Sequence, residues 1–230
     1  MVWNGLDDSM IWSAFKLSLF VTLAATGVVV LVGTAFAFLL ARRKFRGREL
    51  LDAVVTLPLV LPPTVTGYYL IVLLGRHGLI GAYLYELTGW SVTFNWAGAV
   101  IAAAVMALPL MVKSARAAIE SVNPRYEIAS YTLGKGELET FFRITLPLAG
   151  RGILAGIVLS FARALGEFGA TLMLAGNIPG KTQTMPLAIY ETVVAGEDRK
   201  AQLLALVLTA VSITAIYLTN KLTDGRVRSG

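Results

Sequence analysis

The sequence predicts an all-α integral membrane protein, a bundle of about six transmembrane helices with one long cytoplasmic loop. Three observations lead to this prediction. Of 230 residues, 56% are hydrophobic and only 15% are charged, whereas an ordinary soluble domain carries about 25% charged residues. The mean hydropathy is +0.70, and several charge-free runs are long enough to cross a bilayer. We therefore expect a single membrane domain over residues 1–230.

The positions of the first spans follow from length, because a membrane-crossing helix needs about 20 mostly apolar residues. Four charge-free runs meet this requirement: Leu17–Ala41, Ala53–Gly75, Leu87–Val112 and Ala201–Asn220. The third run is expected to enter the membrane only near Trp96, because residues 89–95 are polar and typical of a turn. The first run is too long for the core of a cleaved signal peptide.

Two further segments bring the expected number of spans to six. The apolar stretch Ile144–Leu174 is interrupted by three charged residues: Arg151, Arg163 and Glu167. The segment Thr184–Gly196 is short and contains Glu191. We expect this segment to be a short span buried among the other helices, because a carboxylate facing lipid would be costly.

The distribution of basic residues predicts the orientation of the bundle. Residues 42–48 contain five Lys or Arg and residues 113–151 contain six, whereas residues 76–95 contain one. Because loops rich in basic residues stay in the cytoplasm, the N-terminus is expected outside and the 196–200 turn inside. Six spans then place the tail, residues 221–230, outside although it carries three basic residues. Five spans would place the tail inside.

The stretch AGNIPGKT, Ala175–Thr182, differs by one residue from a phosphate-binding loop, which would need glycine in place of Ala175. It lies at the outer end of an expected span, where Gly, Pro and Asn favour a tight reversal of the chain. The chain has no cysteine and a single histidine, His77, and no reactive set of side chains. We therefore expect no metal, cofactor or catalytic site, and we assign any ATP chemistry to a partner.

The loop formed by residues 120–147 is expected to contain two short helices. Asn123 is suited to cap a helix that begins at Pro124, and Gly134 stands where that helix would end in the left-handed conformation. A second helix is expected to begin near Glu137. Each helix has an apolar face: Tyr126, Ala129 and Leu133 on the first, Leu138, Phe141 and Phe142 on the second.

The apolar residues of the 120–147 loop have two explanations, and physical reasoning alone leaves both open. The loop can dock to another protein, with the small residues Ala129 and Ser130 allowing close approach and the aromatic residues filling pockets. Alternatively, the loop can lie on the membrane surface as an amphipathic segment.

The same loop resembles a signature of the permease subunits of ABC importers. Glu127-x-Ala129, Gly134 and Ile144-x-Leu146-Pro147 match the E-A-A…G…I-x-L-P pattern, and Ile128 departs from it. The resemblance implies that the loop is a coupling helix that docks into the ATP-binding subunit. We assign this coupling to Tyr126, Glu127, Ala129, Gly134, Phe141 and Phe142, of which Glu127, Ala129 and Gly134 match the pattern.

The resemblance is strongest to the permeases of molybdate importers, in the stretches 57–81 and 161–190. It implies a homodimer that works with two ATP-binding subunits carrying ATP-Mg, and with a periplasmic or extracellular molybdate-binding protein. The expected location is the plasma (inner) membrane of a bacterium or archaeon. Tungstate, which is nearly the same size and shape, is expected to share the route. A sulfate or thiosulfate importer is the near alternative, because its permeases carry similar stretches.

A different class of protein, a self-contained secondary transporter or channel, is the remaining alternative. The absence of an inverted internal repeat and the presence of the 120–147 loop argue against it. The basic segment 42–48 is interpreted as an orientation anchor that also contacts lipid headgroups. The basic residues lie in the gaps between apolar runs, so nucleic acid is not an expected partner.

A dianion needs a polar route through the bilayer, because an unpaired ion in hydrocarbon is very costly. Hydroxyl groups near helix breaks are the candidates for pore or gate positions: Thr64, Thr66, Thr171, Thr182 and Thr184. The first two follow Pro62-Pro63, a step that removes helical hydrogen bonds. The alternative for each threonine is a hydrogen bond back to its own helix.

Arg163 and Glu167 are four residues apart and share a helix face, so we expect an intramembrane ion pair. The preferred interpretation is that the pair fixes one helix within the bundle. The alternative is a contact to a partner helix, or a contact that changes during gating.

Overall fold

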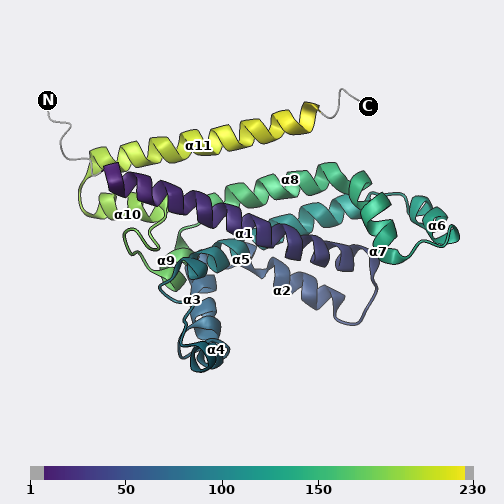
Figure 1. Ribbon diagram of the computed structural model, residues 1–230, viewed down its shortest axis with the longest axis horizontal. Helices are drawn as coiled ribbons and strands as arrows, with labels where there is room; N and C mark the ends of the chain where they lie inside the picture. Colours follow the sequence, from purple (N-terminus) through teal and green to yellow (C-terminus); the bar gives the residue numbers. More distant parts are fainter. Residues whose placement is uncertain (1–7, 226–230) are drawn as a thin grey trace.

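The computed structural model describes residues 8–225, and all the regular elements in this range are helices (Figure 1). In chain order they are α1 (Asp8–Arg42), α2 (Arg48–Val60), α3 (Pro63–Leu74), α4 (Gly81–Thr88), α5 (Trp96–Glu120), α6 (Pro124–Thr132), α7 (Glu137–Thr140), the π-helical turn η1 (Phe141–Thr145), α8 (Leu146–Leu165), α9 (Gly169–Ala175), α10 (Met185–Val194) and α11 (Asp198–Gly225).

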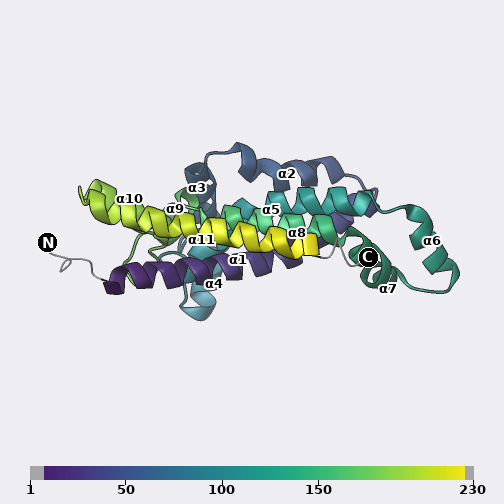
Figure 2. The ribbon, with the colours of Figure 1, turned by 90° about the horizontal axis from the view of Figure 1, so that it is seen from above.

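Helix α5 forms the centre of the bundle and packs against both α1 and α8 (Figures 1 and 2). Its buried face is rich in alanine, including Ala99, Ala103 and Ala107. Small residues let membrane helices approach closely, and glycines of the neighbouring helices use this space. A Cβ atom on Gly33 of α1 would lie 2.7 Å from Met111 Cγ, and one on Gly152 of α8 would lie 2.4 Å from Ala118 Cβ.

Four helices of the described chain are long and apolar enough to cross a membrane: Met10–Arg42, Trp96–Ser121, Glu137–Leu165 and Asp198–Tyr217. These four helices confirm the all-helical membrane architecture. The Trp96 start of the third predicted span is also confirmed. We call the end of the bundle that carries the 120–147 loop the loop end, and the end where α1 begins the α1-start end.

The second expected span, Ala53–Gly75, is not one continuous helix. It breaks at Leu61 and Pro62, and α3 projects with α4 to one side of the bundle (Figure 1). The cause is the Pro62-Pro63 step, which lacks two backbone N–H groups and disfavours helical geometry before each proline. Helix α3 then packs tightly against α9, where a Cβ atom on Gly67 would lie 2.9 Å from Ala170 Cα.

The fifth expected span begins earlier and ends earlier than the sequence suggested. The second helix of the 120–147 loop is the first part of this span, because α7, η1 and α8 form one helical segment over Glu137–Leu165. The π-helical turn accounts for this continuity, because its wider hydrogen-bonding ring leaves room for Pro147, which cannot donate. The helix stops at Leu165, and α9 starts only at Gly169.

The expected sixth span is wrong, because α10 does not cross the bundle. Its ten residues measure about 15 Å, half of a bilayer core. At its start Met185 N donates to Ser18 Oγ of α1 at 2.7 Å, and its side chains pack on Ala14 and Leu204. Both ends of α10 therefore lie in the half of the bundle where α1 begins. The 196–200 turn lies at this same end, the α1-start end (Figures 1 and 2).

Helix α11 consequently runs back toward the loop end, where its described residues finish (Figures 1 and 2). This arrangement reverses the expected sides of the 196–200 turn and of the C-terminal tail relative to the 120–147 loop. Six spans would have placed the basic tail outside, against the rule that basic segments stay in the cytoplasm. In the structure the tail instead follows a helix that ends at the same end as the other basic segments, so this conflict disappears. Residues 226–230 of the tail lie outside the described residues.

Single-cysteine labelling tests this topology directly, because the chain has no cysteine of its own. We expect Lys135→Cys and Lys221→Cys to react with a membrane-impermeant maleimide from the same side of the membrane. We expect Glu197→Cys to react only from the other side. The measurement compares intact cells with inverted vesicles, and the unaltered chain is the blank. Labelling of Lys221→Cys and Glu197→Cys from one side would contradict the arrangement.

Candidate functional site

The 120–147 loop has the local structure that its sequence predicts. Helix α6 begins at Pro124, and its N-cap Asn123 accepts a hydrogen bond from Arg125 N at 3.0 Å. The helix ends before Gly134, which has φ 78° and therefore adopts the left-handed conformation that favours glycine. Both ends of this short helix are thus fixed by residues within the loop itself.

An apolar groove of about 520 Å³ lies between α6 and the start of the long helix α7–η1–α8. Its apolar lining consists of Tyr126, Ala129, Leu133, Ile144, Pro147 and Leu148. Three charged residues also line the groove and are joined by ion pairs, because Glu139 Oε1 lies 2.7 Å from Lys135 Nζ and 3.3 Å from Arg143 Nε. An apolar centre with a charged rim is typical of a surface that binds another protein.

The structure corrects the expected exposure of one apolar residue of the loop, Phe141. Tyr126, Ala129 and Phe142 are exposed, and Leu133 is 79% exposed. Phe141 is buried instead, because its ring packs against Phe38 of α1 with 4.6 Å between the ring centroids.

Ser130 is also buried, and it lines the groove beside Ala129. Its Oγ forms a 2.8 Å hydrogen bond with Thr140 Oγ1, and both residues are buried. This bond joins α6 to the start of the long helix and so fixes one wall of the groove relative to the other.

Glu127 is buried and anchors the loop to the bundle. Its Oε1 lies 2.9 Å from Arg42 Nη2 and accepts a 2.6 Å hydrogen bond from Thr145 Oγ1. Arg42, the last residue of α1, also donates to the backbone oxygens of Ile119 at 2.9 Å and Val122 at 3.4 Å. One arginine therefore holds together the ends of α1 and α5 and the start of α6. Sequence reasoning missed this role and interpreted Arg42 only as an orientation anchor.

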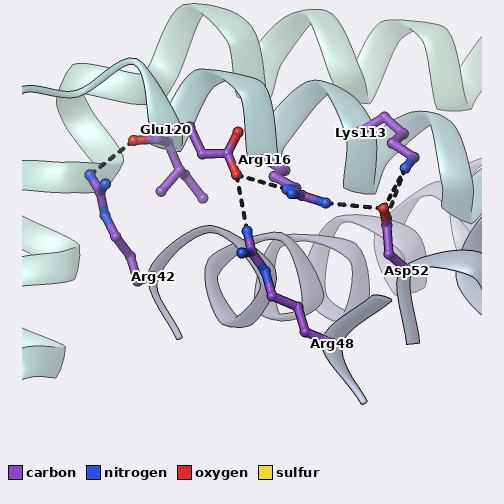
Figure 3. A network of polar contacts seen from close by, with 7 residues as sticks. Arg42, Arg48, Asp52, Lys113, Arg116 and Glu120 are labelled. Atoms are coloured by element: carbon purple, nitrogen blue, oxygen red, sulfur yellow. Dashed lines mark hydrogen bonds and ion pairs between the residues drawn. The ribbon is translucent and has the colours of Figure 1, made fainter. Parts of the chain in front are cut away.

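A second set of ion pairs joins α2 to α5 at the same end (Figure 3). Asp52 accepts from Lys113 Nζ at 2.8 Å and lies 3.1 Å from Arg116 Nη1. Glu120 lies 2.8 Å from Arg116 Nε and 3.5 Å from Arg48 Nη2. The hydrogen bond from Lys113 holds the pKa of Asp52 below its usual range, so the carboxylate stays charged at neutral pH.

The candidate pore threonines lie in different settings. Thr64 is exposed, and Thr171 is buried on α9. Thr182 belongs to the turn before α10, because its Oγ1 accepts from Ile178 N at 3.0 Å. Thr66 and Thr184 are buried, and their Oγ1 atoms have no hydrogen-bond partner among the described residues. The packing of α3 on α9 brings the helices of Thr64, Thr66 and Thr171 together.

The AGNIPGKT stretch forms the turn between α9 and α10, with Gly176 and Gly180 at positive φ. This stretch is not flanked by a strand, so it lacks the setting of a phosphate-binding loop. The turn is held by Glu191 of α10, whose Oε2 accepts from Asn177 Nδ2 at 2.7 Å and from Gln183 Nε2. This carboxylate–amide cluster is a second feature that sequence reasoning missed.

Arg163 and Glu167 form an ion pair, with 2.6 Å between Arg163 Nη1 and Glu167 Oε2. The two groups are not aligned for a hydrogen bond. The second carboxylate oxygen, Oε1, accepts from Ala170 N at 2.8 Å. Glu167 therefore caps the N-terminus of α9. The pair thus occurs where the fifth expected span breaks into α8 and α9.

The structure defines an all-helical, multi-pass membrane protein with an apolar groove at one end. The chain matches the family model "Binding-protein-dependent transport system inner membrane component" over residues 9–229, and it belongs to this family. It is therefore a multi-pass permease component of an inner membrane, and its family implies a separate ATPase and a binding protein.

The chain is similar to individual permeases of two different transport systems. The chain is 46% identical over 221 residues to the molybdenum transport system permease protein ModB of Escherichia coli (strain K12), which covers 95% of this chain and 96% of that protein. It is 34% identical over 220 residues to the sulfate transport system permease protein CysT of Salmonella typhimurium, which covers 96% of this chain and 79% of that protein.

Among solved structures, the chain is similar to a bacterial alginate ABC transporter in complex with an alginate pentasaccharide-bound periplasmic protein. The TM-score is 0.75 at 16% identity, and the match covers 97% of this chain and 82% of that chain. At this level of identity the likeness shows the fold alone.

Proposed function

We propose that this chain is the membrane-spanning permease subunit of an ATP-driven importer of molybdate, with tungstate sharing the route. The observation that carries this proposal is the 46% identity, over nearly the whole length of both chains, to a molybdenum permease. The sulfate permease is 34% identical and longer than this chain. A sulfate or thiosulfate importer is therefore the second candidate.

The assembly that we propose is a homodimer with two ATP-binding subunits, which carry the ATP-Mg, and a binding protein outside the membrane. The homodimer is supported by the small number of long spans, because four such helices are too few to enclose an alternating pathway. We propose that the loop end faces the cytoplasm and that the N-terminus lies outside, because the segments richest in Lys and Arg lie at the loop end.

The groove of the 120–147 loop is the proposed docking site for the ATP-binding subunit. ATP binding shifts the permease between two arrangements only through contacts that differ between them, and a rigid connection transmits such a shift best. The continuous helix from Glu137 to Leu165 provides this connection, because movement of the groove at its first turns moves the whole of α8. The Glu127–Arg42 ion pair couples the same movement to α1.

The proposed pathway for the anion uses hydroxyl groups rather than cations. Thr66 and Thr184 are the strongest of the five candidates, because each has a buried hydroxyl without a partner among the described residues. Thr64 lies on the same helix as Thr66, α3, and Thr171 lies on α9, which packs against α3. Thr182 supports the turn that carries Thr184. The Arg163–Glu167 pair is proposed to fix the break between α8 and α9.

The test of the cargo is the ATPase activity of the reconstituted complex in the presence of binding proteins loaded with different anions. We expect the molybdate-loaded binding protein to stimulate ATP hydrolysis several-fold more than the empty protein, because a loaded protein favours a different arrangement of the permease. A sulfate-loaded sulfate-binding protein is the matched control. Stimulation by the sulfate protein alone would reject molybdate in favour of the second candidate.

A further inference from the structure

We infer that a groove between the 43–47 segment, α2 and α5 binds the phosphate group of an anionic phospholipid. This groove has a volume of about 600 Å³ and lies at the loop end, apart from the groove of the 120–147 loop. We call it the α2 groove. The inference rests on the lining of this groove and does not depend on the identity of the transported anion.

Positive charge exceeds negative charge around the α2 groove. Lys44, Arg48 and Arg116 line it together with two carboxylates, Glu49 and Asp52. Asp52 is already neutralised, because Lys113 Nζ lies 2.8 Å and Arg116 Nη1 3.1 Å from its oxygens.

Two of the lining cations are not fully engaged. Within residues 8–225, Lys44 forms no ion pair, and Arg48 Nε is buried without a hydrogen-bond partner although its Nη2 lies 3.5 Å from Glu120. A phosphate group would supply the counter-charge that Lys44 lacks and a further acceptor for the guanidinium of Arg48, whose side chain is 31% exposed.

The backbone adds donors to the same groove. Gly47, the N-cap of the 13-residue helix α2, has φ 90°, and no side chain caps the helix. Arg48 N donates to the backbone oxygen of Phe45 at 3.3 Å, so the free N–H groups of this helix end are those that follow it. The free N–H groups of a helix N-terminus and the positive end of its dipole favour an anion. The residues of this first turn, Arg48, Glu49 and Leu50, line the groove together with Lys44, so the helix end and this cation border one site.

An apolar row leads away from the α2 groove and distinguishes a lipid from free phosphate. Leu50, Val54 and Leu57 are 69%, 57% and 47% exposed and are spaced at i, i+4 and i+7, so they share one face of α2. Leu50 also lines the groove. A ligand with a phosphate in the groove and acyl chains along this row matches both surfaces, whereas inorganic phosphate uses only the first.

The experiment measures lipid binding to the full-length chain purified in mild detergent, by native mass spectrometry during titration. The probes are phosphatidylglycerol, phosphatidylcholine and inorganic phosphate. We expect phosphatidylglycerol to bind at least fivefold more tightly than phosphatidylcholine. We expect Lys44→Gln to weaken phosphatidylglycerol binding about fivefold, the effect of one cation near a phosphate.

Arg46→Gln is the matched control, because Arg46 lies in the same segment, is exposed and forms no ion pair within residues 8–225, but does not line the groove. We expect it to change binding less than twofold. Equal losses in the two variants would overturn the site in favour of diffuse attraction. Displacement of the lipid by millimolar inorganic phosphate would overturn its assignment to a lipid, and so would equal binding of phosphatidylcholine.

Discussion

Replacing Leu133 with aspartate is expected to reduce ATP-driven uptake at least tenfold while the chain still inserts and folds in the membrane. Leu133 is 79% exposed and lines the groove of the 120–147 loop, so the substitution removes no packing within the chain. The loss arises on docking, when the carboxylate would be taken out of water into an apolar surface without a partner.

The size of this effect follows from the position of Leu133 within the proposed interface. The few residues that dominate a protein interface cost about 2 kcal/mol or more when truncated, which corresponds to about thirtyfold in affinity. An unpaired buried carboxylate imposes a desolvation cost that is at least as large. The measurement is the amount of ATP-binding subunit that co-purifies with each variant, together with the uptake rate. Both quantities should fall together, because the docking contact is the only route that we propose for the driving force.

Thr132→Asp is the matched control for Leu133→Asp. Thr132 is the neighbouring residue, is also exposed, and does not line the groove. The same charge is therefore introduced one position away, and we expect co-purification and uptake to stay within twofold of the unaltered chain. Normal uptake by Leu133→Asp, or equal losses in both variants, would show that the ATP-binding subunit does not dock on this groove.

Local rules were sufficient to predict much of this loop and of the central bundle. Asn123, Pro124 and Gly134 specify the start and end of α6 through contacts within a few residues. The entry of α5 at Trp96 could be predicted for the same reason, since polar residues precede an uninterrupted apolar run. Predictions of this kind succeed where the physical cause lies within one or two helical turns.

Two of the errors occurred where the cause lies far away along the chain. The segment that forms α10 is too short for a span, but its apolar composition is the same whether it crosses the membrane or returns. Its return is fixed by the bond from Met185 N to Ser18 Oγ, which joins residues 167 positions apart. The burial of Glu127 depends likewise on Arg42, 85 positions away. No local pattern distinguishes these residues from exposed ones.

Glu127→Ala is expected to lower the free energy of unfolding by about 2 kcal/mol and to reduce uptake at least tenfold. Removing one partner of a buried ion pair typically costs about 3–5 kcal/mol. The cost is smaller here because Arg42 keeps its two backbone acceptors, the carbonyl oxygens of Ile119 and Val122. Thr145 Oγ1 loses its acceptor. The groove then loses its fixed position on α1, which accounts for the loss of uptake.

Glu137→Ala is the control that separates a buried anchor from a surface contact. Glu137 pairs with Arg43, so it also joins the end of α1 to the same loop, but the two side chains are 39% and 57% exposed. Pairs as exposed as this contribute little, and we expect a change within about 0.5 kcal/mol. Thermal unfolding followed by the fluorescence of the four tryptophans measures both variants. Similar shifts in the two unfolding curves would mean that burial of Glu127 does not hold the loop in place. If Glu127→Ala lowers the stability as expected but uptake stays normal, the position of the groove on α1 does not control transport.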